Sequence, residues 1–240
     1  MIIEFLKVDV LWFFVCEICK LRFYNIKKKI MKYTIEKHPW NIFPKSSPIK
    51  KLIIGSFPPN KMVLPVGCKM KYLDEIVKVN KRETKRFDFF YGSQQNEFWV
   101  LFFKTQNINL EPSNLDGLKQ WLKINEWGVT DFVFKTTRKK DSPSDNDLIP
   151  KEWNIDVIEK VLKMNTVKNI YFTSKWVQKN FIKRIKPSLH QNILKHLLIS
   201  PSPSGLRVIP KDILHNFPKN KNESNKDFRF RYFEHVLLNR

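Results

Sequence analysis

The sequence predicts an α/β fold of three layers, α/β/α, in which helices cover both faces of a central, mostly parallel sheet of four strands. Short apolar runs of strand length alternate along the chain with segments that have helical spacing, and this alternation is typical of parallel sheets joined by crossover helices. The 240 residues suffice for one sizeable core. A hydrophobic content of 42%, with 14% aromatic residues, is typical of a folded globular chain.

The expected strands are short runs rich in apolar residues. Their ranges are 51–55 (KLIIG), 128–137 (GVTDFVFKTT), 167–174 (VKNIYFTS) and 192–200 (NILKHLLIS). The expected helices carry apolar residues at helical spacing, and their ranges are 96–105, 114–125, 154–164, 174–186 and 225–239. Asn154 and Ser174 stand where N-caps are favoured. The polar segments 138–150 and 219–226 are expected to be loops.

A single domain is expected at residues 38–240, preceded by an N-terminal extension at residues 1–37. The extension is helical, or it results from an upstream start site, with Met31 as the true first residue. Charged residues between Glu4 and Lys20 interrupt its apolar run, so no stretch reaches the ~20 apolar residues that a transmembrane helix needs. No membrane partner is expected, although an amphipathic helix packed on the domain or on a membrane surface is the alternative for this segment.

The charge is strongly positive, because 44 Lys and Arg against 23 Asp and Glu give +21 at pH 7. Such an excess favours a polyanionic partner, since basic side chains that neutralise phosphates release condensed counterions. A lysine-rich surface inherited from an AT-rich genome explains the same charge without any partner. The composition alone leaves both explanations open.

The cysteine spacing does not indicate a metal site. Cys16 and Cys19 form a C-E-I-C pair and Cys68 lies far away, whereas a structural zinc or iron–sulfur site normally uses four ligands. Reduced thiols in a cytoplasmic protein, associated with the nucleoid if the source is bacterial, are the simpler interpretation. No metal and no cofactor are expected.

Two loops rich in Pro, Ser and Gly follow the first and fourth expected strands, and Arg138 follows the second. Ligands of open parallel α/β sheets bind beyond the carboxyl ends of the strands, so these segments predict the location of a pocket. The first loop, which begins at Gly55 and reads G-S-F-P-P, lacks the second Gly and the Lys-Ser/Thr of a nucleotide P-loop. It either brings rigid backbone close to a flat ligand or is a structural turn.

A third segment, residues 87–99 (FDFFYGSQQNEFW), joins aromatic residues to a polar turn. Tyr91 offers a face on which a nucleobase can stack, an interaction of ~1–3 kcal/mol. The Asn96 amide donates and accepts hydrogen bonds, so it can read a base edge or hold a water. Alternatively, Asn96 only caps the following helix. Phe98 and Trp99 are assigned to the core.

The loop after the fourth strand, residues 200–207 (SPSPSGLR), alternates prolines with serines whose hydroxyls and amides can bind a phosphate backbone. Gly205 permits a tight bend, and Leu206 beside Arg207 suits a wedge into a base stack. The alternative is a proline-rich connector with an incidentally exposed leucine.

The order of these segments resembles the uracil-DNA glycosylase superfamily over residues 38–238, with the closest likeness to its mismatch-specific and hypoxanthine-type branches. The matching motifs are Gly-x-x-Pro after the first strand, an aromatic-x-x-x-x-Asn-x-Phe-Trp segment, and Pro-Ser-Gly-Leu after the last strand. The resemblance implies a monomeric enzyme of base-excision repair. Such an enzyme binds DNA, flips out a deaminated base (uracil or hypoxanthine-like) and hydrolyses its N-glycosidic bond.

The resemblance also implies roles for individual residues. The catalytic position is Asn96. The base-binding positions are Gly55, Ser56, Phe57, Pro58, Tyr91 and Ser200. The DNA-contacting positions are Arg138, Ser202, Pro203, Ser204, Gly205, Leu206 and Arg207.

Two positions depart from the family pattern. Phe57 stands where members often carry the Asp or Asn that positions the attacking water, and Ser200 stands where the most active uracil enzymes keep a His. Asp131 and Asp145 are the carboxylates that could substitute, although Asp131 also suits a buried structural role and Asp145 a helix cap. The alternative function is a non-catalytic DNA-binding relative with a degraded base pocket. A pocket for a nucleotide or another small molecule is a third alternative.

Overall fold

The computed structural model describes residues 35–58, 89–93, 96–110, 114–140, 144–202 and 209–238. The strands are β1 (Glu36–Lys37), β2 (Ile42–Phe43), β3 (Lys51–Gly55), β4 (Trp127–Asp131), β5 (Val133–Arg138), β6 (Leu148–Trp153), β7 (Asn169–Phe172) and β8 (Leu194–Leu197). The helices are α3 (Phe98–Thr105), α4 (Leu115–Ile124), α5 (Ile155–Lys163), α6 (Lys175–Arg184), α7 (Lys211–Asn216) and α8 (Asn225–Leu238). Two short 3₁₀ turns are η3 (Asp145–Asp147) and η4 (Pro187–Leu189).

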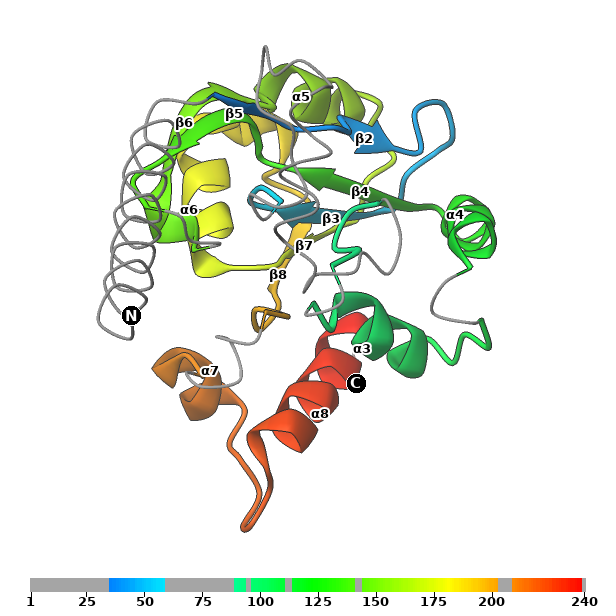
Figure 1. The fold of residues 1–240 in the computed structure, drawn as a ribbon. Coiled ribbons are helices and arrows are strands. Elements are labelled where there is room, and N and C mark those ends of the chain that lie inside the picture. Colours follow the sequence, from blue (N-terminus) through cyan, green and yellow to red (C-terminus); the bar gives the residue numbers. More distant parts are fainter. Residues whose placement is uncertain are drawn as a thin grey trace, which may run out of the picture.

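Across the described residues, the central sheet has five strands in the order β2-β4-β3-β7-β8 (Figure 1). Strands β4, β3, β7 and β8 are parallel to one another, and β2 pairs antiparallel with β4 at one edge. The four parallel strands confirm the predicted sheet. The two-residue β2 is an addition, and so short a strand leaves no periodic signal in the sequence.

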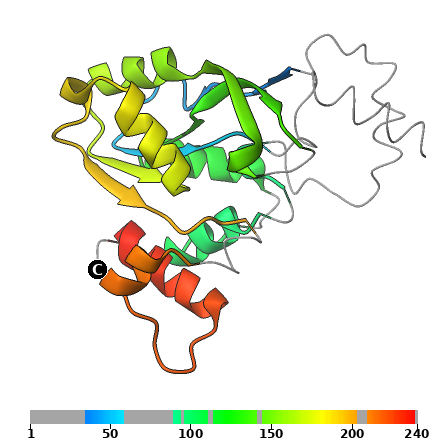
Figure 2. The same cartoon turned by 90° about the vertical axis from the view of Figure 1, so that its left-hand side faces the viewer.

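Side chains of the sheet alternate between two hydrophobic cores, as the period of two in a strand requires. Ile53 of β3 enters one core, which also contains residues of α3, α4, α7 and α8. Its neighbours Leu52 and Ile54 enter the other core, which contains residues of α5 and α6. Figure 2 shows the resulting layers, with α5 and α6 on one side of the sheet and α3 and α8 on the other. The α/β/α prediction is confirmed.

Residues 128–137, predicted as one strand, form two strands in different sheets. β4 ends at Asp131, and β5 begins at Val133 in an antiparallel sheet of order β1-β5-β6. The chain bends at Phe132, whose N–H donates to the Gly55 carbonyl (2.8 Å) and whose carbonyl accepts from the Asn154 N–H (2.9 Å). The ring of Phe132 is fully buried. Because the bend itself is apolar, the sequence reads as one uninterrupted run.

The segment predicted as the loop 138–150 includes the start of a strand. β6 pairs antiparallel with β5, with Arg138 opposite Leu148. Among the six residues of β6 only Leu148 is buried, and Pro150 argues against a strand in the sequence. β1 pairs with β5 as well, so the fold includes residues just before position 38.

Helix starts follow the predicted caps in part. The Ser174 hydroxyl accepts from the Val177 N–H (3.3 Å), as expected for the N-cap of α6. Asn154 occupies the N-cap position of α5 but makes no side-chain cap hydrogen bond. Its amide nitrogen instead donates to the Asn41 carbonyl (2.9 Å) and to Thr130 Oγ1 (2.9 Å), so it links the edge strand region to β4.

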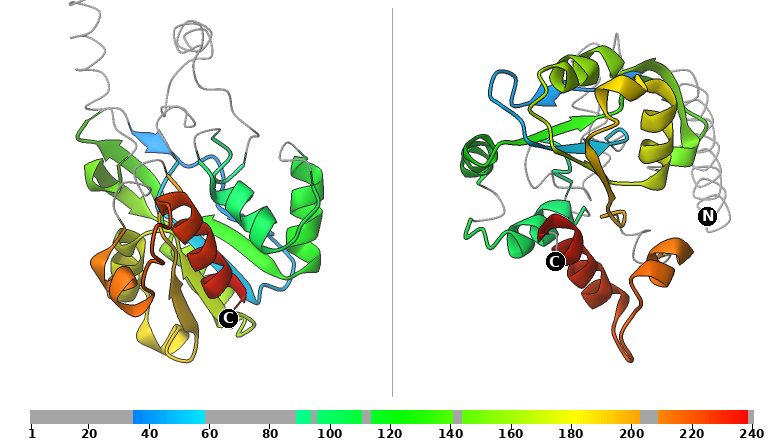
Figure 3. Two further views of the ribbon diagram at one scale, coloured as in Figure 1. Left: turned by 90° about the horizontal axis from the view of Figure 1, so that it is seen from below. Right: turned by 180° about the vertical axis from the view of Figure 1, so that it is seen from behind.

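Helices α3 and α8 lie side by side beneath the sheet, as the view from below shows (Figure 3). Phe98 and Trp99 are buried there, which confirms their assignment to the core. The ring centroids of Phe98 and Phe233 are 6.2 Å apart across the two helices. Within the ranges that the structure describes, no helix is both long and apolar enough to cross a bilayer.

Candidate functional site

The parallel strands β3 and β4 end side by side, with Gly55 opposite Asp131. Tyr91 lies over this pair, and its hydroxyl donates to Asp131 Oδ1 (3.3 Å). A Cβ atom at position 55 would lie 3.0 Å from Tyr91 Cζ and closer still to the Tyr91 hydroxyl and to Asp131 Oδ1. Gly55 therefore permits a close approach that any side chain would prevent.

Asp131 is also bonded to His38, whose Nε2 lies 2.8 Å from Asp131 Oδ2. The Trp40 N–H donates to His38 Nδ1 (3.0 Å), so Nδ1 carries no proton. With Nδ1 as an acceptor, Nε2 is the ring nitrogen that donates to the carboxylate. His38 and Asp131 are 3% and 4% exposed. This geometry is that of the buried structural role considered for Asp131, and nothing in the sequence around His38 signalled the contact.

Tyr91 combines a buried hydroxyl with a strained backbone. Burial raises the pKa of Tyr91 well above its ordinary value, and the negative charge of Asp131 raises it further. The hydroxyl therefore stays protonated and can donate. The residue has φ 55°, in the left-handed region that non-glycine residues rarely occupy. Its ring packs on Phe98 at 4.6 Å between centroids, the residue as a whole is partly exposed, and stacking of a base on the ring stays a prediction.

The turn after β3 is filled by Phe57. This side chain is 7% exposed and packs against Val133 and Leu148, with its ring edge-on to His38 at 5.6 Å. The Ser56 carbonyl accepts from the Val133 N–H (3.0 Å), which fixes the backbone of the turn. Phe57 therefore forms an apolar wall at the position where a polar group was expected from the family pattern.

Arg138 of β5 binds the backbone of the turn that follows β3. Its Nη2 donates to the Pro58 carbonyl (2.6 Å), and its Nε donates to both oxygens of the Glu36 carboxylate (3.0 Å each). The guanidinium lies 5.7 Å from the centre of the Phe57 ring. Because Arg138 is 4% exposed, the predicted contact with DNA, which stays a prediction, would require the pair with Glu36 to open.

Asn96 lies at the start of α3, where its Oδ1 accepts from the Phe98 N–H (2.9 Å). Asn96 therefore bonds the first turn of α3, but the N-cap position predicted for it is occupied by Glu97, which makes no side-chain cap hydrogen bond. A carbonyl oxygen accepts two hydrogen bonds, so this hydrogen bond does not prevent the same amide from holding a water. The catalytic role of Asn96 stays a prediction.

The Asn96 turn is tied to the loop after β8. The Glu97 N–H donates to the Pro201 carbonyl (3.2 Å), and Ser200 and Ser202 share a hydroxyl hydrogen bond (2.9 Å). Arg229 of α8 lies beneath both segments. Its Nη1 is 3.3 Å from Glu97 Oε2, and its Nη2 donates to the Ser202 carbonyl (3.1 Å).

Arg229 is 1% exposed and was not identified from the sequence. In the sequence, Arg229 stands among the aromatic residues of DFRFRYF, which predict a buried helix face. Because a buried face is expected to be apolar, an arginine there indicates a charge that is paired inside the protein. Burial lowers the pKa of the Arg229 guanidinium, and the charge of Glu97 opposes that shift. A buried cation that binds one carboxylate and loop carbonyls fixes the relative position of the two loops.

Asp145 lies at the first position of η3, next to the ends of β3 and β7. Its Oδ2 accepts from the Ser174 hydroxyl (2.8 Å). The predicted cap role was wrong, because Ser144 occupies the N-cap position and accepts from the Asn146 N–H (3.3 Å). Burial raises the pKa of the Asp145 carboxyl, while the Ser56 and Ser174 side chains lower it.

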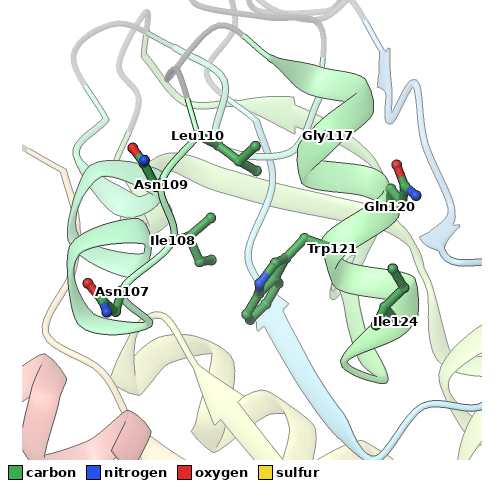
Figure 4. Close-up of a pocket in the computed structure, with 8 residues that line it drawn as sticks. All are labelled: Asn107, Ile108, Asn109, Leu110, Gly117, Gln120, Trp121 and Ile124. Carbon is green, nitrogen blue, oxygen red and sulfur yellow. The ribbon is translucent and has the colours of Figure 1, made fainter.

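Other candidate positions lie outside the described residues, namely Pro203, Ser204, Gly205, Leu206, Arg207, Cys16, Cys19 and Cys68. In the described ranges, no group of three or more His, Cys, Asp or Glu side chains could hold a metal ion. A hollow of about 350 Å³ lies between α4 and the segment that follows α3, and Ile108 and Trp121 are among its lining residues (Figure 4). It contains none of the candidate site residues.

No protein-family model matches the sequence, and no curated protein matches it. Among solved structures, the chain is similar to the solution NMR structure of a "putative Uracil DNA glycosylase" from Methanosarcina acetivorans. The two share 18% sequence identity with a TM-score of 0.45, and the match covers 80% of this chain and 93% of that chain. The site described above therefore rests on its own geometry.

Proposed function

We propose that the protein is a DNA glycosylase that hydrolyses the N-glycosidic bond of a deaminated base, uracil or hypoxanthine-like. One observation carries the proposal: the segments that resemble glycosylase motifs, far apart in the sequence, meet at the carboxyl edge of the sheet. The Tyr91 hydroxyl lies over Gly55, and the Glu97 N–H donates to the Pro201 carbonyl. Ligand sites of open α/β sheets occur at this edge.

The reaction that this arrangement would serve begins with extrusion of the base from the helix. Tyr91 provides the aromatic surface for the extruded base. Bond cleavage develops positive charge on the sugar and negative charge on the base, so donors near the base and a water near the sugar carbon are needed. Asn96 holds that water. Because an amide is no general base at neutral pH, we expect slow turnover on a base that is a good leaving group or is mispaired.

DNA is the proposed partner, and a net charge of +21 suits it. Ser202 to Arg207 are proposed to contact the strand, with Leu206 as the wedge. The active species is proposed to be a monomer in the cytoplasm, without metal or cofactor. The affinity for DNA should fall steeply with salt, in proportion to the phosphates neutralised.

A second candidate function is non-catalytic DNA binding. The burial of Phe57 against Val133, Leu148 and His38 favours it, because an apolar wall cannot polarise water. Under this alternative the protein binds a flipped or mismatched base and leaves its glycosidic bond intact. Salt-dependent binding without excision on every substrate would establish it.

The matched pair Asn96→Ala and Asn114→Ala tests the catalytic assignment. Both residues accept a hydrogen bond at a helix start, Asn96 from the Phe98 N–H (2.9 Å) and Asn114 from the Gly117 N–H (2.8 Å). Loss of either hydrogen bond at a helix start should cost about 0.5–2 kcal/mol of stability. Single-turnover excision should fall about 100-fold or more in Asn96→Ala only. Full activity in Asn96→Ala would show that the catalytic group lies elsewhere.

A further inference from the structure

We propose that Asp145 is a catalytic residue of this site, the carboxylate that accepts a proton from the attacking water. The inference rests on the proposed glycosylase function and assigns a group that can do what Phe57 cannot. It follows from the position of the Asp145 side chain and from its contacts with Ser56 and Ser174.

Asp145 comes to the site from the connection between β5 and β6, and two serines direct it there. The Ser174 hydroxyl, directly after the end of β7, donates to Asp145 Oδ2 (2.8 Å). Ser56, directly after the end of β3, also interacts with the carboxyl and lowers its pKa. A side chain held by residues from the ends of two adjacent parallel strands lies where ligands of such sheets bind.

Asp145 suits the role better than Asp131. The Asp131 carboxylate already accepts from His38 and Tyr91 and is 4% exposed. Asp145 as a residue is less buried than Asp131, and its carboxylate accepts from the Ser174 hydroxyl. Since a carboxylate has about four acceptor positions, the hydrogen bond from the Ser174 hydroxyl leaves capacity for a water. Asp131 therefore positions Tyr91, and Asp145 faces the substrate.

In the proposed step the water oxygen forms a bond to C1′ of the deoxyribose as the bond from C1′ to the base nitrogen breaks. The electron pair of that bond stays on the base. One water proton moves to the Asp145 carboxylate, and it is later released to the departing base or to solvent. The products are the free base and an abasic site, and no oxidant, reductant or further reactant is needed.

The charged and titratable groups that face Asp145 are Asp131 from β4, Arg138 from β5 and Tyr91 from the segment before α3. Burial and the charge of Asp131 raise the pKa of Asp145, and Arg138 opposes the shift. A base must be ionised to act, so excision should decline as the pH falls through this raised pKa.

The matched variants Asp145→Asn and Asp147→Asn test the inference, because both remove a carboxylate from the same 3₁₀ turn. Single-turnover excision should fall about 100-fold or more in Asp145→Asn, the usual scale for a lost general base. Affinity for an uncleavable duplex should stay within about twofold. The acidic decline of the pH–rate profile should disappear in Asp145→Asn and persist in Asp147→Asn. Activity of Asp145→Asn within about threefold of wild type would overturn the assignment.

A second variant guards against a purely structural explanation. Formate added to Asp145→Ala supplies a mobile carboxylate and should restore part of the lost rate, whereas it should not accelerate Asn96→Ala. No rescue, together with weakened duplex binding, would indicate a structural role and overturn the assignment. If wild-type protein excises no base at all, the proposed function fails. An active wild type with an equally active Asp145→Asn refutes only the role of Asp145.

Discussion

The close approach at Gly55 gives the sharpest stability prediction, for the substitution Gly55→Ala. The added Cβ would lie 3.0 Å from Tyr91 Cζ and closer to the Tyr91 hydroxyl and Asp131 Oδ1. Neither neighbour can yield easily, because Tyr91 packs on Phe98 and Asp131 is bonded to His38. Overpacking costs about 1–3 kcal/mol. Loss of the hydrogen bond from Tyr91 to the carboxylate adds about 1.5–3 kcal/mol.

The two costs together are about 2.5–6 kcal/mol, which corresponds to a fall in Tm on the order of 10 °C for a domain of this size. Urea unfolding followed by circular dichroism measures it. Gly117→Ala is the matched control, because its Cβ meets only the Asn114 side chain at 2.8–3.0 Å. In that variant the gain in helix propensity of about 1 kcal/mol offsets the disturbed cap.

A double-mutant cycle with Tyr91→Phe identifies the cause of the loss. Removing the hydroxyl relieves one of the two contacts, so Gly55→Ala should cost less in the Tyr91→Phe background, with a coupling energy of about 0.5–3 kcal/mol. A Gly55→Ala protein within about 0.5 kcal/mol of wild type would refute the reasoning. A cycle with no coupling would show that Tyr91 is not the obstacle.

Three further predictions concern buried charges and hydroxyls. Arg229→Met should lower the free energy of unfolding by about 2–4 kcal/mol, since Glu97 and the carbonyls of Pro201 and Ser202 lose a partner. A loss below about 0.5 kcal/mol in urea unfolding would contradict the proposed role of Arg229 in fixing the two loops. The pKa of the Asp145 carboxyl is raised in the folded protein. The protonated carboxyl therefore contributes to the free energy of unfolding at low pH, and this contribution is lost as the pH rises through the raised pKa. Asp145→Asn should therefore have a higher Tm than wild type at neutral pH and an equal one in acid, and the reverse order would be inconsistent with the shift. Ultraviolet titration should find Tyr171 and Tyr232 ionising near pH 12, since burial raises the pKa of each to about 12. Below pH 11 the titration curves of the Tyr171→Phe and Tyr232→Phe variants should therefore match that of wild type. Ionisation of either tyrosine below pH 11 would contradict its burial.

The sequence was informative wherever a local pattern coincides with an element. Residues 51–55 form β3 with the predicted bounds, and the Ser174 cap begins α6 as expected. These features depend on side chains within a few positions of one another, which local propensity and capping describe well.

Contacts between segments that are far apart in the chain could not be predicted from the sequence. His38 reaches Asp131 across 93 positions, and Arg229 reaches Glu97 across 132. Neither residue has a neighbouring motif, because its partner is chosen by the topology of the sheet and helices. The sequence predicted a cap role for Asp145, because its contacts with Ser56 and Ser174 are formed only in the folded chain. Residues that depart from local patterns are expected to cluster at functional sites.

The most direct test of the glycosylase proposal is an excision assay with the full-length chain. The substrates are oligonucleotides that carry one uracil, hypoxanthine or xanthine, in single strands and opposite each normal base. We predict alkali-labile abasic sites on at least one substrate, formed slowly and lost with Asn96→Ala and Asp145→Asn. No strand cleavage after alkali on any substrate, with salt-dependent DNA binding intact, would contradict the proposal and leave a DNA-binding protein with an inactive pocket.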